Sequence, residues 1–155
     1  MTEGNAVATQ ELEGILRRLD EGRDALIAAL GAADPATFET PAAADESLKS
    51  LLDRTSDDLN FYYGRLAARA LNLPQPPCLS RADFGSLREG TVAIQVAHRR
   101  FANLLHDLLP ADLDKVANDP DHGTHTLRQT LELATAQYRL RTQQVEAIAK
   151  SLGTA

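Results

Sequence analysis

The chain has 155 residues, of which 43% are hydrophobic and 25% charged, so it suits one compact domain and its composition argues against general disorder. Its net charge of −6 argues against partners such as nucleic acid or an anionic membrane, and neither a run of about 20 apolar residues nor an N-terminal signal segment is visible. The single cysteine, Cys78, excludes an internal disulfide, and we expect a cytoplasmic protein with one domain over residues 1–155.

Hydrophobic residues recur every three or four positions in four segments, as one face of an amphipathic helix requires. The first segment spans about residues 9–30. The second begins after Asp45, which is a plausible N-cap, and stops before Pro74. A third helix is predicted to begin at Ser80, with Asp83 three residues later, and to end near proline 110.

The fourth segment begins with a capping box, Thr126-Leu127-Arg128-Gln129, and continues to about residue 150. Residues 111–123 precede it and predict a loop of acidic and turn residues. No segment shows a clear alternation of polar and apolar residues, so no strands are expected. Four helices that each have one apolar face are buried most simply together, and the predicted fold class is therefore all-α, a four-helix bundle.

Two of these helices resemble a known family. The segment SLKSLLDRTSDDLNFYYGRL (residues 47–66) is similar to the second-helix segment of the DinB/YfiT-like proteins, a bacterial superfamily of four-helix bundles. The segment HGTHTLRQTLELATAQYRLRTQQV (residues 122–145) is similar to the last helix of that family, including its threonine-leucine start after a glycine turn. In the family, a histidine on the second helix and a His-x-x-x-His pair on the last helix bind a divalent metal, because residues four apart on a helix point the same way.

All three metal ligands are missing from this chain. The alignment puts Arg54 at the position of the second-helix histidine, and Gln137 and Arg141 at the positions of the histidine pair. An arginine stays protonated near neutral pH and has no lone pair to offer, so a cation here would repel a metal ion. The resemblance therefore implies a member without metal or cofactor, of unknown physiological role, that acts as a binding or interaction module without catalysis.

Two interpretations of the arginines are open. In the first, two guanidinium groups clamp a small anion, such as a carboxylate, phosphate or sulfonate, in a cationic pocket between the second and fourth helices. The residues of this candidate pocket are Arg54, Tyr62, Gln137, Tyr138 and Arg141. In the second interpretation, which we favour, the arginines are paired inside the protein, since Asp57 and Asp58 lie within helical reach of Arg54.

The family often forms pairs, and Phe61 with Ala68 offers a second apolar strip on the predicted bundle, so a homodimer is expected. An alternative function is a metal- or thiol-dependent transferase or isomerase with a rearranged site that recruits His98 or His106. These two histidines lie about 12 Å apart along the third helix, which is too far to share a metal directly.

The remaining candidates for chemistry give weaker signals. His122 and His125 stand at a turn before a helix and are interpreted most simply as polar surface residues. Cys78 follows two prolines and has no neighbouring histidine in the sequence, so it is weakly supported as a nucleophile.

Overall fold

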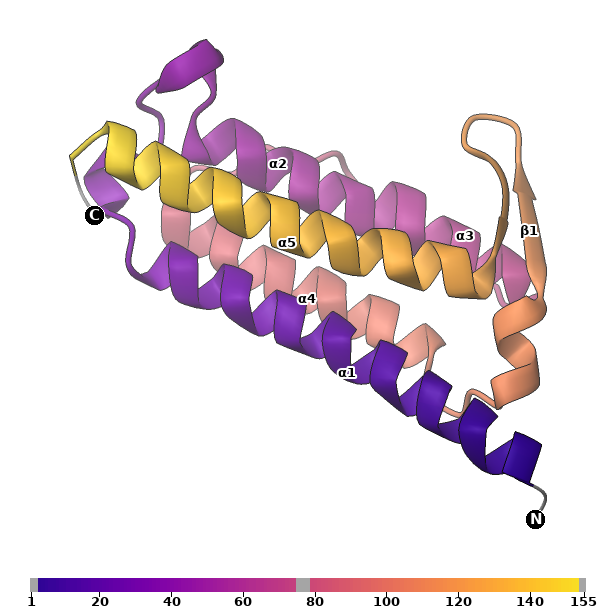
Figure 1. Ribbon diagram of the computed structural model, residues 1–155. Coiled ribbons are helices and arrows are strands. Elements are labelled where there is room, and N and C mark those ends of the chain that lie inside the picture. Colours follow the sequence, from indigo (N-terminus) through magenta and orange to yellow (C-terminus); the bar gives the residue numbers. More distant parts are fainter. Residues whose placement is uncertain (1–2, 75–78, 154–155) are drawn as a thin grey trace.

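The computed structural model describes residues 3–74 and 79–153 and is mostly helical (Figure 1). Its longer elements are α1 (Glu3–Gly31), α2 (Leu48–Asp58), α3 (Gly64–Ala70), α4 (Leu87–Leu104) and α5 (Leu127–Ser151). A π-helical turn, η3 (Leu59–Tyr63), joins α2 to α3 without a break, so within the described residues four long helical segments lie side by side. Short 3₁₀ turns form η1 (Pro35–Thr37), η2 (Ala43–Asp45) and η4 (Pro110–Asp114).

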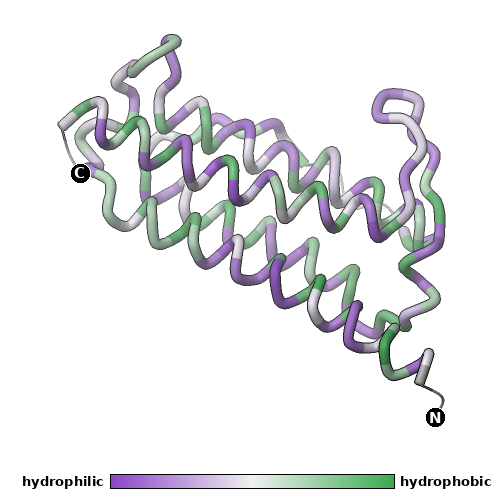
Figure 2. Tube along the Cα trace, in the orientation of Figure 1, coloured by the Kyte–Doolittle hydropathy of each residue, from purple (hydrophilic) through white to green (hydrophobic). Residues whose placement is uncertain are grey.

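The four segments enclose one apolar core. Helix α1 packs along α5, and α2 packs along α4 (Figure 1). Apolar residues recur along each helix between polar ones (Figure 2), and the inward-facing leucines and Phe101 are almost fully buried. Since burying one such side chain contributes about 1.5–3 kcal/mol, this shared core explains why four amphipathic helices pack together. The helical part of the prediction is confirmed.

The N-terminus of α2 lies two residues later than the sequence pattern predicts. Ser47, and not Asp45, is its N-cap: the Ser47 hydroxyl accepts a hydrogen bond from the Ser50 N–H, and the Ser50 hydroxyl accepts one from the Ser47 N–H. Asp45 has a φ of 57°, in the left-handed region, and therefore stands outside the helix. A serine pair satisfies two backbone amides reciprocally, which one aspartate does not.

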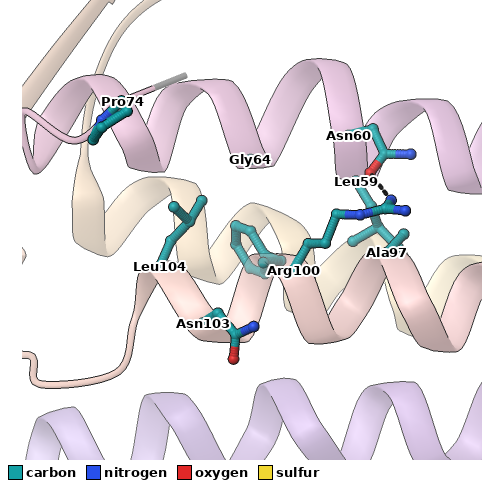
Figure 3. A pocket seen from close by; sticks show the side chains of 9 residues that line it. Leu59, Asn60, Gly64, Pro74, Ala97, Arg100, Asn103 and Leu104 are labelled. Carbon is teal, nitrogen blue, oxygen red and sulfur yellow. Dashed lines mark hydrogen bonds between the residues drawn. The ribbon is translucent and has the colours of Figure 1, made fainter. Parts of the chain in front are cut away.

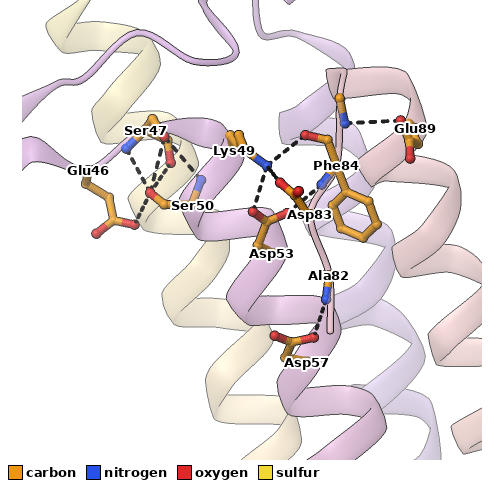
Figure 4. A network of polar contacts seen from close by, with 11 residues as sticks. Glu46, Ser47, Lys49, Ser50, Asp53, Asp57, Ala82, Asp83, Phe84 and Glu89 are labelled. Carbon is orange, nitrogen blue, oxygen red and sulfur yellow. Dashed lines mark hydrogen bonds and ion pairs between the residues drawn. The ribbon is translucent and has the colours of Figure 1, made fainter. Parts of the chain in front are cut away.

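The third helix begins later than predicted and ends earlier, spanning Leu87–Leu104. Ser86 is its N-cap, whereas residues 79–84 are not helical. Carboxylates of α2 hold this non-helical segment by its backbone (Figure 4): Asp57 accepts a hydrogen bond from the Ala82 N–H at 2.8 Å, and Asp53 accepts one from the Phe84 N–H at 3.0 Å. These contacts between distant residues override the local signal at Ser80.

A small antiparallel hairpin precedes α5, so the prediction of no strands is wrong for this segment. Strand β1 (Val116–Asp119) pairs with β2 (Gly123–Thr126). The Asp119 carboxylate accepts a hydrogen bond from the Asp121 N–H at 2.8 Å, and Gly123 has a φ of 83°, which a tight turn needs. Strands of four residues are too short to give a readable alternation. The predicted capping box at the start of α5 is confirmed.

Candidate functional site

A group of polar side chains lies between α2 and α5. Arg141 of α5 is only 7% exposed, and its Nη2 lies 3.3 Å from Oδ2 of Asp58 on α2. Its Nη1 donates a hydrogen bond to Gln144 Oε1 at 2.9 Å. Gln137, one helical turn before Arg141, has its Nε2 3.5 Å from the same Asp58 oxygen. Two side chains of α5 therefore converge on one carboxylate oxygen of α2, and we name Asp58, Gln137 and Arg141 the Arg141 cluster.

The cavity beside the Arg141 cluster is very small. Its volume is about 10 Å³, which is about the space of one water molecule. The residues that line it are Thr55, Asp58, Leu59, Tyr63, Ala134, Gln137, Tyr138 and Arg141. A carboxylate, phosphate or sulfonate does not fit while these side chains keep their positions. The anion that faces Arg141 is therefore the protein's own Asp58.

The structure brings together three of the five predicted pocket residues, namely Gln137, Tyr138 and Arg141. Arg54 instead lies on the exposed side of α2 and pairs with Glu46. Tyr62 lies against His122 of the hairpin, with 4.1 Å between the ring centroids. Tyr138 lines the small cavity, and its hydroxyl lies 2.7 Å from Nδ1 of His98.

Helix geometry explains why Arg54 and Asp58 differ. At about 100° per residue, Arg54 lies about 125° from the centre of the buried face that Leu48, Leu52 and Thr55 define, whereas Asp58 lies about 85° from it. Asp58 thus stands at the edge of the buried face, where it reaches across to α5. Neither aspartate pairs with Arg54. Asp57 accepts a hydrogen bond from the backbone of the linker, and Asp58 pairs with Arg141.

The histidine considered for an alternative enzyme connects three helices. His98 of α4 is 2% exposed; its Nδ1 lies 2.7 Å from the Tyr138 hydroxyl on α5, and its Nε2 lies 3.0 Å from Asp20 Oδ1 on α1. Burial lowers the pKa of His98, although the hydrogen bond to Asp20 acts in the opposite direction. Burial also raises the pKa of Tyr138. A neutral imidazole that joins α1, α4 and α5 is typical of a structural network.

The other candidates lie apart from His98. His106 is exposed just after the end of α4, and His122 and His125 belong to the hairpin. Cys78 lies outside the described residues. Among the residues that are described, no three His, Cys, Asp or Glu side chains form a group that could hold a metal ion.

A larger pocket, which the sequence pattern did not indicate, lies between the π-helical turn and α4 (Figure 3). Its volume is about 200 Å³. The residues that line it are Leu59, Asn60, Gly64, Pro74, Ala97, Arg100, Phe101, Asn103 and Leu104. Figure 3 shows the Arg100 side chain reaching toward Asn60, and Arg100 Nη1 lies 3.3 Å from Asn60 Oδ1. We name this cavity the π-turn pocket.

Gly64 allows the π-helical turn to form. Its N–H donates a hydrogen bond to the Leu59 carbonyl, five residues earlier. A Cβ atom at position 64 would lie 2.7 Å from that carbonyl oxygen, so any side chain would displace the backbone. Single π-helical turns inside α-helices recur at functional sites. Gly64 is the one local signal for this turn, and a glycine inside a helical pattern does not by itself distinguish a π-helical turn from close packing between helices.

An ionic network holds the linker that follows α3 against α2 (Figure 4). Lys49 Nζ donates hydrogen bonds to Asp53 Oδ2 at 3.0 Å, to Asp83 Oδ1 at 2.6 Å and to the Phe84 carbonyl at 2.9 Å. The hydrogen bond from Lys49 lowers the pKa of Asp83. A second, more polar hollow lies between this linker and α4, and it shares Asn60 and Arg100 with the π-turn pocket.

Comparison with models of known families, with curated proteins and with solved structures finds no match for this chain. None of the described helices combines the length and apolar character needed to cross a lipid bilayer. The fold and its polar sites define a mostly helical protein that joins α2 and α5 by a partly buried ion pair and has a separate pocket beside a π-helical turn.

Proposed function

We propose that the chain is a DinB/YfiT-like four-helix bundle without the family's metal, and that it acts as a binding or interaction module without catalysis. The observation that carries this proposal is the buried Arg141 guanidinium paired with Asp58. When the chain is aligned with the family, Gln137 and Arg141 stand at the positions of the histidine pair. Both side chains are directed at Oδ2 of Asp58 on α2.

The donor set of the Arg141 cluster does not fit a divalent metal. Asp58 offers a carboxylate and Gln137 an amide oxygen, but a guanidinium has no lone pair and carries the same sign of charge as the ion. In our proposal, Arg141 supplies the positive charge that a metal supplies in the family, and the ion pair links the two helices.

Metal titration tests this proposal in tag-free protein. We expect no stoichiometric binding of Zn²⁺ or Ni²⁺ to the wild type by isothermal titration calorimetry. The double variant Q137H/R141H keeps Asp58 and presents two histidines and one carboxylate, a set that transition metals accept. This variant should bind one metal ion and gain thermal stability from it.

A triple variant, D58A/Q137H/R141H, is the matched control and should bind the metal more weakly. If the double variant binds no metal, the correspondence between the Arg141 cluster and the family's metal site is wrong. If the wild type binds one equivalent of metal within the helices, the alternative of a metal-dependent transferase replaces the proposed module.

The proposal keeps the expected homodimer and cytoplasmic location. The homodimer interface, however, must use a surface other than the predicted apolar strip of Phe61 and Ala68. Ala68 is buried, and the Arg81 guanidinium lies 4.0 Å above the Phe61 ring. Light scattering after size-exclusion chromatography measures the oligomeric state directly, and a monomeric mass would remove the homodimer from the proposal.

A further inference from the structure

We infer that the π-turn pocket binds a small organic monocarboxylate, with the apolar body of the ligand inside the pocket and its carboxylate at Arg100 and Asn60. This inference is independent of the loss of the metal, because no residue of the Arg141 cluster lines the π-turn pocket.

The size of the pocket limits the ligand. A cavity of about 150 Å³ in another protein holds a benzene molecule, so about 200 Å³ accommodates a ring or a short aliphatic chain with one polar group. The deepest lining residues are the apolar Leu59, Ala97 and Phe101, each of which is at most 3% exposed. A ligand here therefore gains binding free energy from the burial of apolar surface.

The charge at the mouth selects an anion. Arg100 has no carboxylate within ion-pair distance among the described residues, and its one hydrogen bond there is to the neutral Asn60 amide at 3.3 Å. No aspartate or glutamate is among the residues that line the pocket. A carboxylate would accept charge-assisted hydrogen bonds from the guanidinium, which are stronger than the present contact to an amide. The Asn60 amide group adds a neutral donor beside it.

The helix geometry supplies the space. A π-helical turn places Asn60 and Gly64 in the same segment of the pocket wall, and Gly64 contributes no side chain to fill the cavity. The ligand's apolar body would lie against Gly64 and Leu104, and its carboxylate would point toward Arg100 (Figure 3). The space over Gly64 and the charge of Arg100 thus favour the same orientation of the ligand, with its carboxylate toward Arg100.

Binding of benzoate and hexanoate, followed by amide chemical shifts in NMR, tests the inference. We expect saturable shifts that centre on Asn60, Gly64 and Phe101, with a Kd on the order of 1 mM for ligands of this size. Benzamide and hexanamide, which have similar shapes and no charge, should bind about tenfold more weakly, and inorganic phosphate should shift none of these amides.

The variant R100Q removes the charge from an exposed position, and R99Q is its matched control on the same helix, outside the pocket lining. R100Q should weaken benzoate binding about tenfold, whereas R99Q should change it less than about twofold. The inference is wrong if benzoate and benzamide bind equally, if R99Q has the same effect as R100Q, or if the shifts lie elsewhere on the protein.

Discussion

Replacing Asp58 with leucine would leave the Arg141 guanidinium buried without a carboxylate. Loss of one partner from a buried ion pair typically costs about 3–5 kcal/mol. The Asp58 side chain is 30% exposed and Gln144 still accepts a hydrogen bond from Arg141, so we expect a smaller loss, about 2–3 kcal/mol in the free energy of unfolding.

The reverse change should cost less. In R141M the carboxylate that loses its partner is the more exposed group, which water can still solvate, and we expect a loss of about 1 kcal/mol. The double variant D58L/R141M removes both charges and replaces them with apolar groups. Because such replacements are often neutral or stabilising, it should lie within about 1 kcal/mol of the wild type. The two substitutions are therefore strongly non-additive.

Urea denaturation followed by far-UV circular dichroism gives all four free energies by linear extrapolation. R54M is the matched control, because Arg54 pairs with Glu46 on the exposed side of the same helix and should cost less than about 0.5 kcal/mol. Equal losses for D58L and R54M, or a double variant whose loss equals the sum of the single losses, would refute the buried-pair reasoning.

Three further predictions concern other parts of the fold. Burial lowers the pKa of His98, so the folded state favours the neutral imidazole. The free energy of unfolding should therefore fall as the pH drops below about 6.5. Urea denaturation of H98Q at several pH values should show a flatter dependence on pH. G64A should destabilise the protein by about 1–2 kcal/mol, since its methyl group would contact a backbone carbonyl, whereas G31A has open space around the new Cβ and serves as the thermal-denaturation control. K49M should speed amide hydrogen exchange at Phe84 about tenfold, because the linker loses the ion pair between Asp83 and Lys49 and the hydrogen bond from Lys49 to the Phe84 carbonyl; unchanged exchange would mean that the linker is held by other contacts.

Several features could be predicted from the sequence because they depend on neighbouring residues. The period of the leucines predicts the helices, and the capping box at Thr126 predicts where α5 begins. The same period indicates that Arg141 lies close to the apolar face of its helix, and this arginine is indeed buried. In each case the signal lies within one or two helical turns, so no knowledge of the other helices is needed.

The partners of these residues depend on the tertiary structure. The sequence offers Asp58 as a neighbour of Arg54, but the packing of α2 on α5 pairs it with Arg141, 83 residues away. Likewise, Asp57 accepts a hydrogen bond from the backbone of the linker, 25 residues away. The π-turn pocket also forms where segments distant in the chain meet. The rotation and register of packed helices are set by the whole core, since every buried side chain must fit its neighbours. Periodicity therefore determined which faces are buried, and packing alone decided which side chains meet there.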